Sequence, residues 1–239
     1  MIDTHAHILP GIDDGCSNLE AAVKIAKIAA KQGVTTMIAT PHANDGVYNC
    51  VAEDIYTKCA HLNSALQKEK VAVEILPGAE NRITHDMISM WEQDSFIFLG
   101  NSASAILLEL PNMFILEGVM QIVKLLIERG VIPIIAHPER NPLLMKDTQM
   151  IETLVYEGAK LQLTASSLTG DFGKIVTKTA MTICGLDAVY CVGSDIHPGR
   201  KYRMAKAHKK LRKIGGEQWA NEIMIHNPAS IVSVGGVSV

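Results

Sequence analysis

The chain repeats one unit from end to end, a short apolar run followed by an amphipathic segment that ends at or near a glycine. The pattern predicts strands at 1–4, 34–40, 71–76, 106–110, 131–136, 160–163 and 189–193. Because the strands are apolar on both faces and alternate with helices, we expect a parallel sheet that is covered on both sides. No proline-rich, serine-rich or low-complexity linker divides the 239 residues, so we expect one α/β domain over residues 1–239.

The expected helices follow from apolar periodicity and from residues typical of helix ends. In the first helix, Ser17 and Glu20 have the spacing of a capping box, and Gly33 ends the helix. Further helices are expected at about 49–69, 116–129, 148–157 and 174–184.

Polar side chains occur at or just past the ends of the predicted strands. These residues are His5, His42, Glu80, Glu109, His137 and Asp195. A closed barrel and an open doubly wound sheet both fit the strand pattern, but in a closed barrel the carboxyl ends meet at one mouth. We therefore favour a barrel with its chemistry at that mouth.

The residues at the strand ends and in the adjoining loops are those that bind metal ions. Glu109 interrupts an apolar strand, and a buried carboxylate is costly unless it is paired or bound to a metal. The candidate ligands are His5, His7, Asp14, His42, Glu80, Glu109, His137, Asp195 and His197. Nine ligands exceed the first shell of one ion and predict two or three ions. Imidazole and carboxylate without thiolate indicate manganese, iron or zinc, and clustered ions of this kind hydrolyse phosphoesters.

Composition excludes several other classes of protein. Lys and Arg total 22 and Asp and Glu total 25, so the formal charge of −3 gives no global attraction to nucleic acid or to an anionic membrane. The apolar region 106–127 contains charged residues and Pro111 and cannot span a bilayer. We expect no signal peptide, and five scattered cysteines without a C-x-x-C pair favour reduced thiols in the cytoplasm.

The motifs taken in order resemble a known family. His-x-His at 5–7, Thr-Pro-His at 40–42, Gly-x-Glu at 78–80, Ala-His-Pro-Glu-Arg at 136–140 and Ser-Asp-x-His at 194–197 are similar to the polymerase-and-histidinol-phosphatase (PHP) superfamily. The opening segment 1–15 resembles the capsule and exopolysaccharide tyrosine phosphatases of bacteria, a manganese-dependent branch. The resemblance extends from residue 2 to residue 228 and implies a distorted (β/α)7 barrel of the PHP type.

The resemblance also implies a distribution of the ligands over three ions. One ion would be held by His5, His7, Glu80 and Asp195; a second by Glu80, Glu109 and His137; a third by Asp14, His42 and His197. Asp13 replaces Asp14 if the loop is shifted by one position. Arg140 and Arg200 match the phosphate-binding arginines of the family, and a guanidinium suits this role because it binds phosphate oxygens in pairs.

The sequence departs from the family pattern in three places. Ala6 stands where relatives often have cysteine, and Ala43 where many have a second histidine. The segment between His197 and Arg200 is short, which leaves Arg203 as an alternative to Arg200.

These features predict a metal-dependent protein-tyrosine phosphatase that acts on the phosphotyrosine tail of a bacterial tyrosine kinase controlling polysaccharide export. None of the five cysteines has an arginine six positions later, so the phosphate loop of cysteine-dependent tyrosine phosphatases is absent. The alternatives are a small-molecule phosphatase of the histidinol-phosphate type, a PHP exonuclease, and a non-catalytic metal-binding scaffold.

A basic segment near the C-terminus has two interpretations. Residues 200–213 contain eight Lys or Arg and no acidic residue. The segment could attract an acidic phosphotyrosine tail. Alternatively, it is a helix with solvated charges whose Met204, Ala207, Leu211 and Ile214 face the core.

Overall fold

Short parallel strands form the centre of the molecule in a computed structural model that describes residues 1–233 apart from 49, 85–86, 88–95, 102–103 and 115. Within these residues the strands are β1 (Ile2–Ala6), β2 (Thr36–Ala39), β3 (His42–Ala43), β4 (Glu74–Leu76), β5 (Glu80–Arg82), β6 (Ala105–Glu109), β7 (Ile132–Ala136), β8 (Lys160–Thr164) and β9 (Val189–Gly193). They pair in the orders β1-β2-β4 and β3-β5-β6-β7-β8-β9, and every pairing is parallel.

Two of the expected strands are each followed, after an interruption, by a further short strand. Thr40 and Pro41 separate β2 from β3, and residues 77–79 separate β4 from β5. At the second interruption a Cβ on Gly78 would lie 2.8 Å from Ile38 Cγ2, so only glycine fits this close approach. β3 and β5 lie beyond the expected strands at 34–40 and 71–76, so the structure has the seven expected strands and these two short additions.

The first and last strands close the ring. Ala6 forms a parallel bridge with Ile196, and the backbone N–H of Asp195 donates a hydrogen bond to the His5 carbonyl at 2.8 Å. The fully buried Asp3 joins the same two segments, because it accepts hydrogen bonds from the N–H of Ser194 and the hydroxyl of Tyr202. The expectation of a distorted seven-stranded barrel is confirmed.

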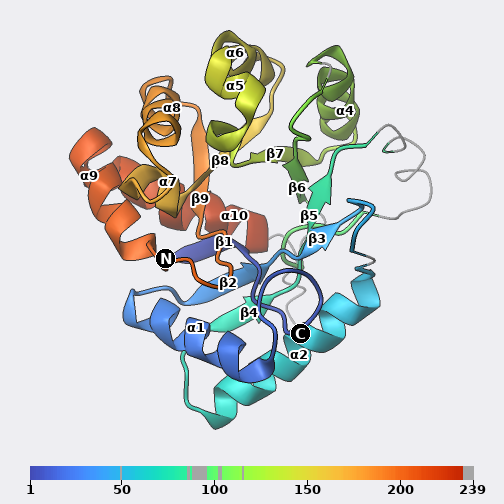
Figure 1. The fold of residues 1–239 in the computed structure, drawn as a ribbon, viewed down its shortest axis with the longest axis vertical. Coiled ribbons are helices and arrows are strands. Elements are labelled where there is room, and N and C mark those ends of the chain that lie inside the picture. The colour runs from blue at the N-terminus through green and yellow to red at the C-terminus, as the bar shows by residue number, and fades with distance from the viewer. Residues whose placement is uncertain (49, 85–86, 88–95, 102–103, 115, 234–239) are drawn as a thin grey trace.

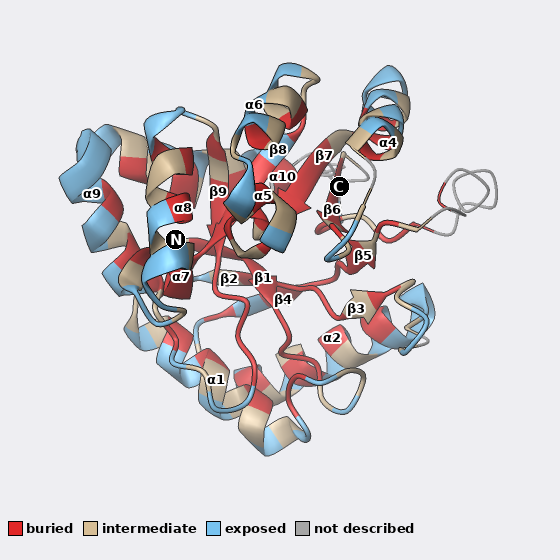
Figure 2. Ribbon diagram, turned by 45° about the horizontal axis from the view of Figure 1, so that its top comes forward, coloured by how far each residue is buried: buried red, intermediate tan, exposed pale blue. Residues whose placement is uncertain are grey.

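Helices surround the strands (Figure 1), and their outer faces are exposed (Figure 2). They are α1 (Leu19–Lys31), α2 (Ala52–Lys68), α4 (Leu116–Glu128), α5 (Pro142–Lys146), α6 (Gln149–Tyr156), α7 (Ala165–Thr169), α8 (Lys174–Gly185), α9 (Met204–Asn221) and α10 (Asn227–Ser233), with a 3-10 turn at Pro138–Arg140 and a π-helix at Glu222–His226. The strands supply the core: Met37, Ile106, Ile135, Leu161 and Val192 are fully buried. Within the described residues, no helix is both long and apolar enough to cross a bilayer.

The predicted capping box of the first helix is wrong. The N-cap of α1 is Asn18, whose side chain accepts a hydrogen bond from the N–H of Ala21 at 2.9 Å. The helix thus starts one residue later than a cap at Ser17 requires, and Glu20 falls in the second helical position, where it cannot complete the box. Asn49, where the second helix was expected to begin, lies outside the described residues, and α2 begins at Ala52.

The basic segment after Arg200 forms α9. Met204, Ala207 and Leu211 are buried against the core, as a helix with solvated charges predicts. Ile214 departs from that prediction, because it is 37% exposed.

Candidate active site

The nine candidate ligands gather at the carboxyl ends of the strands. His5 lies in β1, His42 begins β3, Glu80 begins β5, and Glu109 ends β6; His7, Asp14, His137, Asp195 and His197 lie in the segments that follow strands. Because all strands are parallel, these ends face the same mouth of the barrel. The structure brings together residues up to 192 positions apart in the sequence, from His5 to His197.

The innermost group consists of the four residues expected around the first ion. Nε2 of His5 and Nε2 of His7 lie 3.1 Å apart, and Glu80 Oε2 is 3.5 Å and 3.4 Å from them. Asp195 Oδ1 lies 3.7 Å from the first nitrogen and 3.6 Å from the second. Ligand atoms about 2.1 Å from one shared ion are roughly 3–3.5 Å from each other, so the spacing suits a cation.

Around Glu109 the arrangement differs from the expected set. His137 Nε2 lies 2.7 Å from Glu80 Oε1, but the group of ligand atoms that includes Glu109 is completed by His42 and Glu80. Glu109 also accepts a hydrogen bond from Arg82 Nη1 at 2.9 Å. Sequence reasoning missed Arg82, and its position two residues after Glu80 of Gly-x-Glu offered no signal.

The outermost group contains Asp14, His42 and His197, joined by His7. Asp14 Oδ1 lies 3.2 Å from His197 Nε2 and 3.6 Å from His42 Nε2. Its side chain is 51% exposed, so this group is the one open to solvent.

Asp13 and Gln162 orient the two innermost imidazoles. Asp13 Oδ2 accepts a hydrogen bond from His7 Nδ1 at 2.7 Å and is bound also by the backbone N–H of His42. Gln162 Oε1 lies 2.7 Å from His5 Nδ1, and its amide nitrogen donates to the Thr4 hydroxyl. A second partner of this kind fixes which ring nitrogen faces a metal. The loop register therefore favours Asp14 as ligand, with Asp13 behind His7.

Gln162 was missed although the sequence carried a signal. It is a polar residue within the predicted strand at 160–163, and it is 1% exposed. The same reasoning that singled out Glu109 applies to it.

Two buried ligand atoms without hydrogen-bond partners also indicate that the cluster binds divalent ions. His42 Nδ1 and Glu80 Oε2 are buried and make no hydrogen bond, although Oε2 lies within 3.5 Å of three imidazole nitrogens. Buried polar atoms without partners are rare and call for a ligand. Imidazole and carboxylate donors suit manganese, iron and zinc.

The charges of the cluster shift its pKa values strongly. Burial lowers the pKa of His5, but the carboxylates of Glu80 and Asp195 outweigh it and raise the pKa to about 9. Burial likewise acts against His7, while its hydrogen bond to Asp13 and the nearby carboxylate of Glu80 raise its pKa to about 9. Burial and the neighbouring His7 lower the pKa of His197 to about 4.

Two arginines border the cluster. Arg140 binds Asp195 Oδ2, and Arg200 Nη1 donates to the same oxygen at 2.7 Å and to the Asp195 carbonyl at 2.9 Å. Arg203 instead pairs with Asp171, at 2.6 Å for its shortest contact, so the structure places Arg200 at the site. A hollow of about 90 Å³ beside the site is lined by residues that include Glu109, His137 and Arg140.

Phe172 holds both guanidinium groups, a role that the sequence did not reveal. Its ring centroid lies 5.0 Å from Arg140 Cζ and 5.5 Å from Arg200 Cζ, within the range of cation–π contacts. The ring limits the directions in which the two charges can point.

Backbone geometry at the site has constraints of its own. His137 and Asp195 have positive φ angles of 34° and 48°, in the left-handed region that non-glycine residues adopt at a cost. A Cβ on Gly193 would lie 2.3 Å from His5 Cβ, so glycine allows β9 to approach β1.

Comparison with known proteins places this geometry in a family. The family model for capsular polysaccharide synthesis, CpsB/CapC, matches residues 1–233. The tyrosine-protein phosphatase YwqE of Bacillus subtilis is 36% identical over 197 residues, covering 82% of this chain and 77% of its own length. The tyrosine-protein phosphatase CpsB of Streptococcus agalactiae is 26% identical, covering 97% of this chain and 98% of its own length.

Solved structures agree. A chain from the crystal structures of YwqE from Bacillus subtilis and CpsB from Streptococcus pneumoniae, described as unique metal-dependent tyrosine phosphatases, superposes with a TM-score of 0.92 at 31% identity. The match covers 99% of this chain and 96% of that chain. With the fold, the ligand cluster and the family model all in agreement, this chain belongs to the CpsB/CapC family of capsular polysaccharide synthesis.

Proposed function

We propose that this chain is a metal-dependent tyrosine-protein phosphatase whose substrate is a phosphotyrosine-bearing segment of a bacterial tyrosine kinase controlling capsular or exopolysaccharide synthesis. The observation that carries the proposal is the cluster of nine imidazole and carboxylate ligands with Arg140 and Arg200 at its edge. The relatives that match most of the chain are tyrosine-protein phosphatases, which supports the same reaction.

The ligand groups would hold two or three divalent ions, for which we propose manganese first and iron or zinc as alternatives. Such ions supply a nucleophile derived from water at neutral pH and neutralise charge on a phosphoryl group. His5, His7, Glu80 and Asp195 would hold the innermost ion, and Asp14, His42 and His197 the outermost. A further ion would lie at Glu80 and Glu109, with His42 beside both carboxylates and His137 beside Glu80.

The residues of the chain itself then bind and orient the substrate. Arg140 and Arg200 donate to the phosphoryl oxygens and stabilise the charge that develops during transfer. Phe172 keeps the two guanidinium groups aimed at one point. The leaving phenolate, with a pKa of about 10, departs with little help from an acid.

The thiols of the chain do not offer another nucleophile. Burial raises the pKa of Cys16 to about 11 and that of Cys191 to about 12, and a thiol reacts as its thiolate. All five cysteines are free, which supports a reducing compartment such as the cytoplasm.

The test is elemental analysis of protein purified without chelator, followed by hydrolysis assays with each metal restored to metal-free enzyme. We expect phosphotyrosine peptides to be hydrolysed and histidinol phosphate and single-stranded DNA to be poor substrates. Rapid turnover of histidinol phosphate with no action on the peptides would contradict the proposal.

Two histidine variants distinguish a catalytic site from a metal-binding scaffold without activity. His42→Ala removes a candidate ligand, whereas His61→Ala removes an exposed histidine on the outer face of α2. We expect the first variant to lose nearly all peptide hydrolysis and the second to keep it. Unchanged activity in His42→Ala would favour a scaffold without catalysis at this site.

A further inference from the structure

The outer face of α9 is strongly basic. From Met204 to Gly216 the helix contains five Lys or Arg and no acidic residue, although the whole chain has a net charge of −3. The buried side chains of this helix account for its packing but not for the sign of its exposed charges. An exposed helix face needs charged residues for solubility, and interspersed charges of both signs meet this requirement without a large field of one sign.

Four of these cations surround one hollow. It measures about 360 Å³ and lies between α7 and α9, which are neighbours in Figure 1. The residues that line it, here named the lysine groove, are Leu168, Thr169, Lys206, Lys209, Lys210 and Lys213. Within the described part of the chain, none of the four lysines forms an ion pair or a side-chain hydrogen bond. The Asp171 carboxylate, whose pKa is lowered by Arg203 and to a smaller extent by Lys206, is hydrogen-bonded to Arg203 and Thr169.

A chain of contacts connects the lysine groove to the active site. Arg200 contacts the Phe172 ring, and the adjacent Asp171 binds Arg203, the residue that precedes α9. Lys206 follows within the first turn of the helix. The positive surface thus runs from the phosphate-binding arginines along α9, with Asp171 as the acidic group that faces it and is already committed to Arg203.

We propose that the lysine groove binds acidic residues next to the phosphotyrosine of the protein substrate, so that the enzyme selects peptides with carboxylates or further phosphates beside the reacting residue. The proposal rests on the proposed function. Lys206 and Lys213 are seven residues apart, which corresponds to about 10 Å along the helix axis. An extended peptide covers that length with about three residues, and two or three acidic side chains suffice to occupy the groove.

A peptide suits the groove better than a membrane or a nucleic acid. The lysines line a concave hollow with an apolar residue, Leu168, whereas a membrane surface needs a protruding face with apolar anchors. Among the residues lining the groove there is no aromatic ring for stacking a base. The experiment below also tests binding to a membrane and to a nucleic acid.

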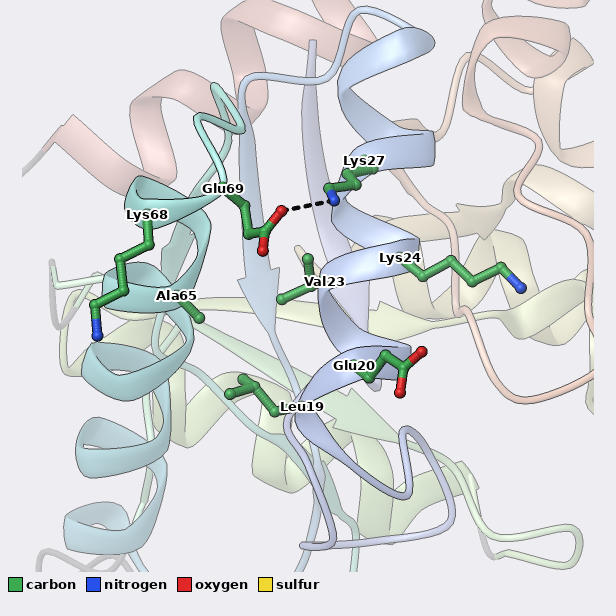
Figure 3. A pocket seen from close by; sticks show the side chains of 8 residues that line it. All are labelled: Leu19, Glu20, Val23, Lys24, Lys27, Ala65, Lys68 and Glu69. Atoms are coloured by element: carbon green, nitrogen blue, oxygen red, sulfur yellow. Dashed lines mark hydrogen bonds and ion pairs between the residues drawn. The ribbon is translucent and has the colours of Figure 1, made fainter.

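The experiment compares two phosphotyrosine peptides, one with Asp and Glu beside the phosphotyrosine and one with Asn and Gln in the same places. The groove variant carries Lys206→Gln, Lys209→Gln, Lys210→Gln and Lys213→Gln. The matched control makes an equal change of charge with Lys24→Gln, Lys27→Gln and Lys68→Gln around the hollow between α1 and α2 (Figure 3) and Lys31→Gln at the end of α1. All eight lysines are exposed, so both variants should fold.

We expect the groove variant to lose about tenfold in kcat/KM on the acidic peptide, mainly through KM, because steering by exposed charges is of this size. Activity on the neutral peptide and on p-nitrophenyl phosphate should stay within a factor of two. The wild-type preference for the acidic peptide should fall as salt rises, and the control variant should behave like the wild type. Equal kcat/KM of wild type and groove variant on the acidic peptide would overturn the proposal.

A direct binding measurement tests the lysine groove independently of the proposed phosphatase reaction. Fluorescence anisotropy with the acidic peptide in its unphosphorylated form reports on the groove even in a preparation that hydrolyses nothing. Loss of this binding in the groove variant alone supports the proposal. Binding of phosphatidylglycerol vesicles or of single-stranded DNA through the same lysines, with no effect on peptide binding, would overturn it.

Discussion

Asp195 divides its two carboxylate oxygens between the ligand cluster and Arg200. Oδ1 lies 3.7 Å from His5 Nε2, and Oδ2 accepts a hydrogen bond from Arg200 Nη1 at 2.7 Å. One side chain thus joins the candidate metal centre to the proposed phosphate-binding arginine. The left-handed backbone at Asp195 turns the carboxylate to face both partners.

Because of this contact, we expect substitution of Arg200 to reduce kcat/KM much more than substitution of the nearby Arg203. Arg200→Lys removes the fork that binds Asp195 and phosphate, so we expect kcat/KM on a phosphotyrosine peptide to fall about 100-fold. Arg203→Lys keeps a cation near Asp171 at the surface and should change the value less than threefold. Steady-state kinetics of both variants checks this, and equal losses would show that Arg200 has no special role.

Substitutions of the adjacent Asp13 and Asp14, in the loop after β1, should affect metal binding to different extents. Asp14→Asn alters a candidate ligand that faces His42 and His197, whereas Asp13→Asn removes the negative charge behind His7, from a side chain that also accepts from the His42 N–H. We expect apparent manganese affinity at the outermost group to be lost in the first variant and to fall about 10–100-fold in the second. Metal titration by calorimetry distinguishes them, and the reverse order would assign the ligand role to Asp13.

Gln162 should act on metal affinity without contacting the metal. Gln162→Leu removes the partner of His5 Nδ1 and frees the ring to change its tautomer. We expect metal affinity to fall about 10–100-fold while kcat at saturating metal falls less. The exposed Gln149→Leu serves as control. Unchanged affinity in Gln162→Leu would show that packing alone orients His5.

The raised pKa values of His5 and His7 predict an effect of pH on the metal-free protein. Both rise from 6.5 to about 9, so their contribution to stability is complete below pH 6.5 and is lost as the pH rises toward 9. We expect the free energy of unfolding of metal-free protein, measured with urea, to decrease between pH 6.5 and 8.5.

Metal binding should show the opposite dependence. Imidazoles must lose a proton to bind an ion, so apparent manganese affinity should increase over the same pH range. His5→Gln should weaken both trends. A metal-free protein whose stability is flat or rises with pH would contradict the pKa values of the cluster.

The sequence was sufficient to predict the strands along the chain and the polar residues at their carboxyl ends, because both depend on local patterns. Apolar runs ending in His, Glu or Asp mark the mouth of a barrel, and the structure places Glu80 and His137 there. The pairing of β9 with β1 is not local. It depends on Asp3 reaching Ser194 and on Gly193 fitting against His5, contacts between residues about 190 positions apart.

The supporting residues escaped prediction for a related reason. Gln162, Phe172 and Arg82 have no motif, and their roles arise only from the partners that the fold brings to them. The error at the start of α1 is different, since Ser17 and Asn18 are both good N-caps and only the backbone decides between them.

The pairing of β1 with β9 has a consequence for how the protein is made. His5 leaves the ribosome at the start of synthesis, and Asp195 follows only after most of the chain has been translated. A nascent chain that lacks its last strand also lacks Asp195 and His197, so the outermost ligand group stays incomplete until nearly the whole polypeptide has been released.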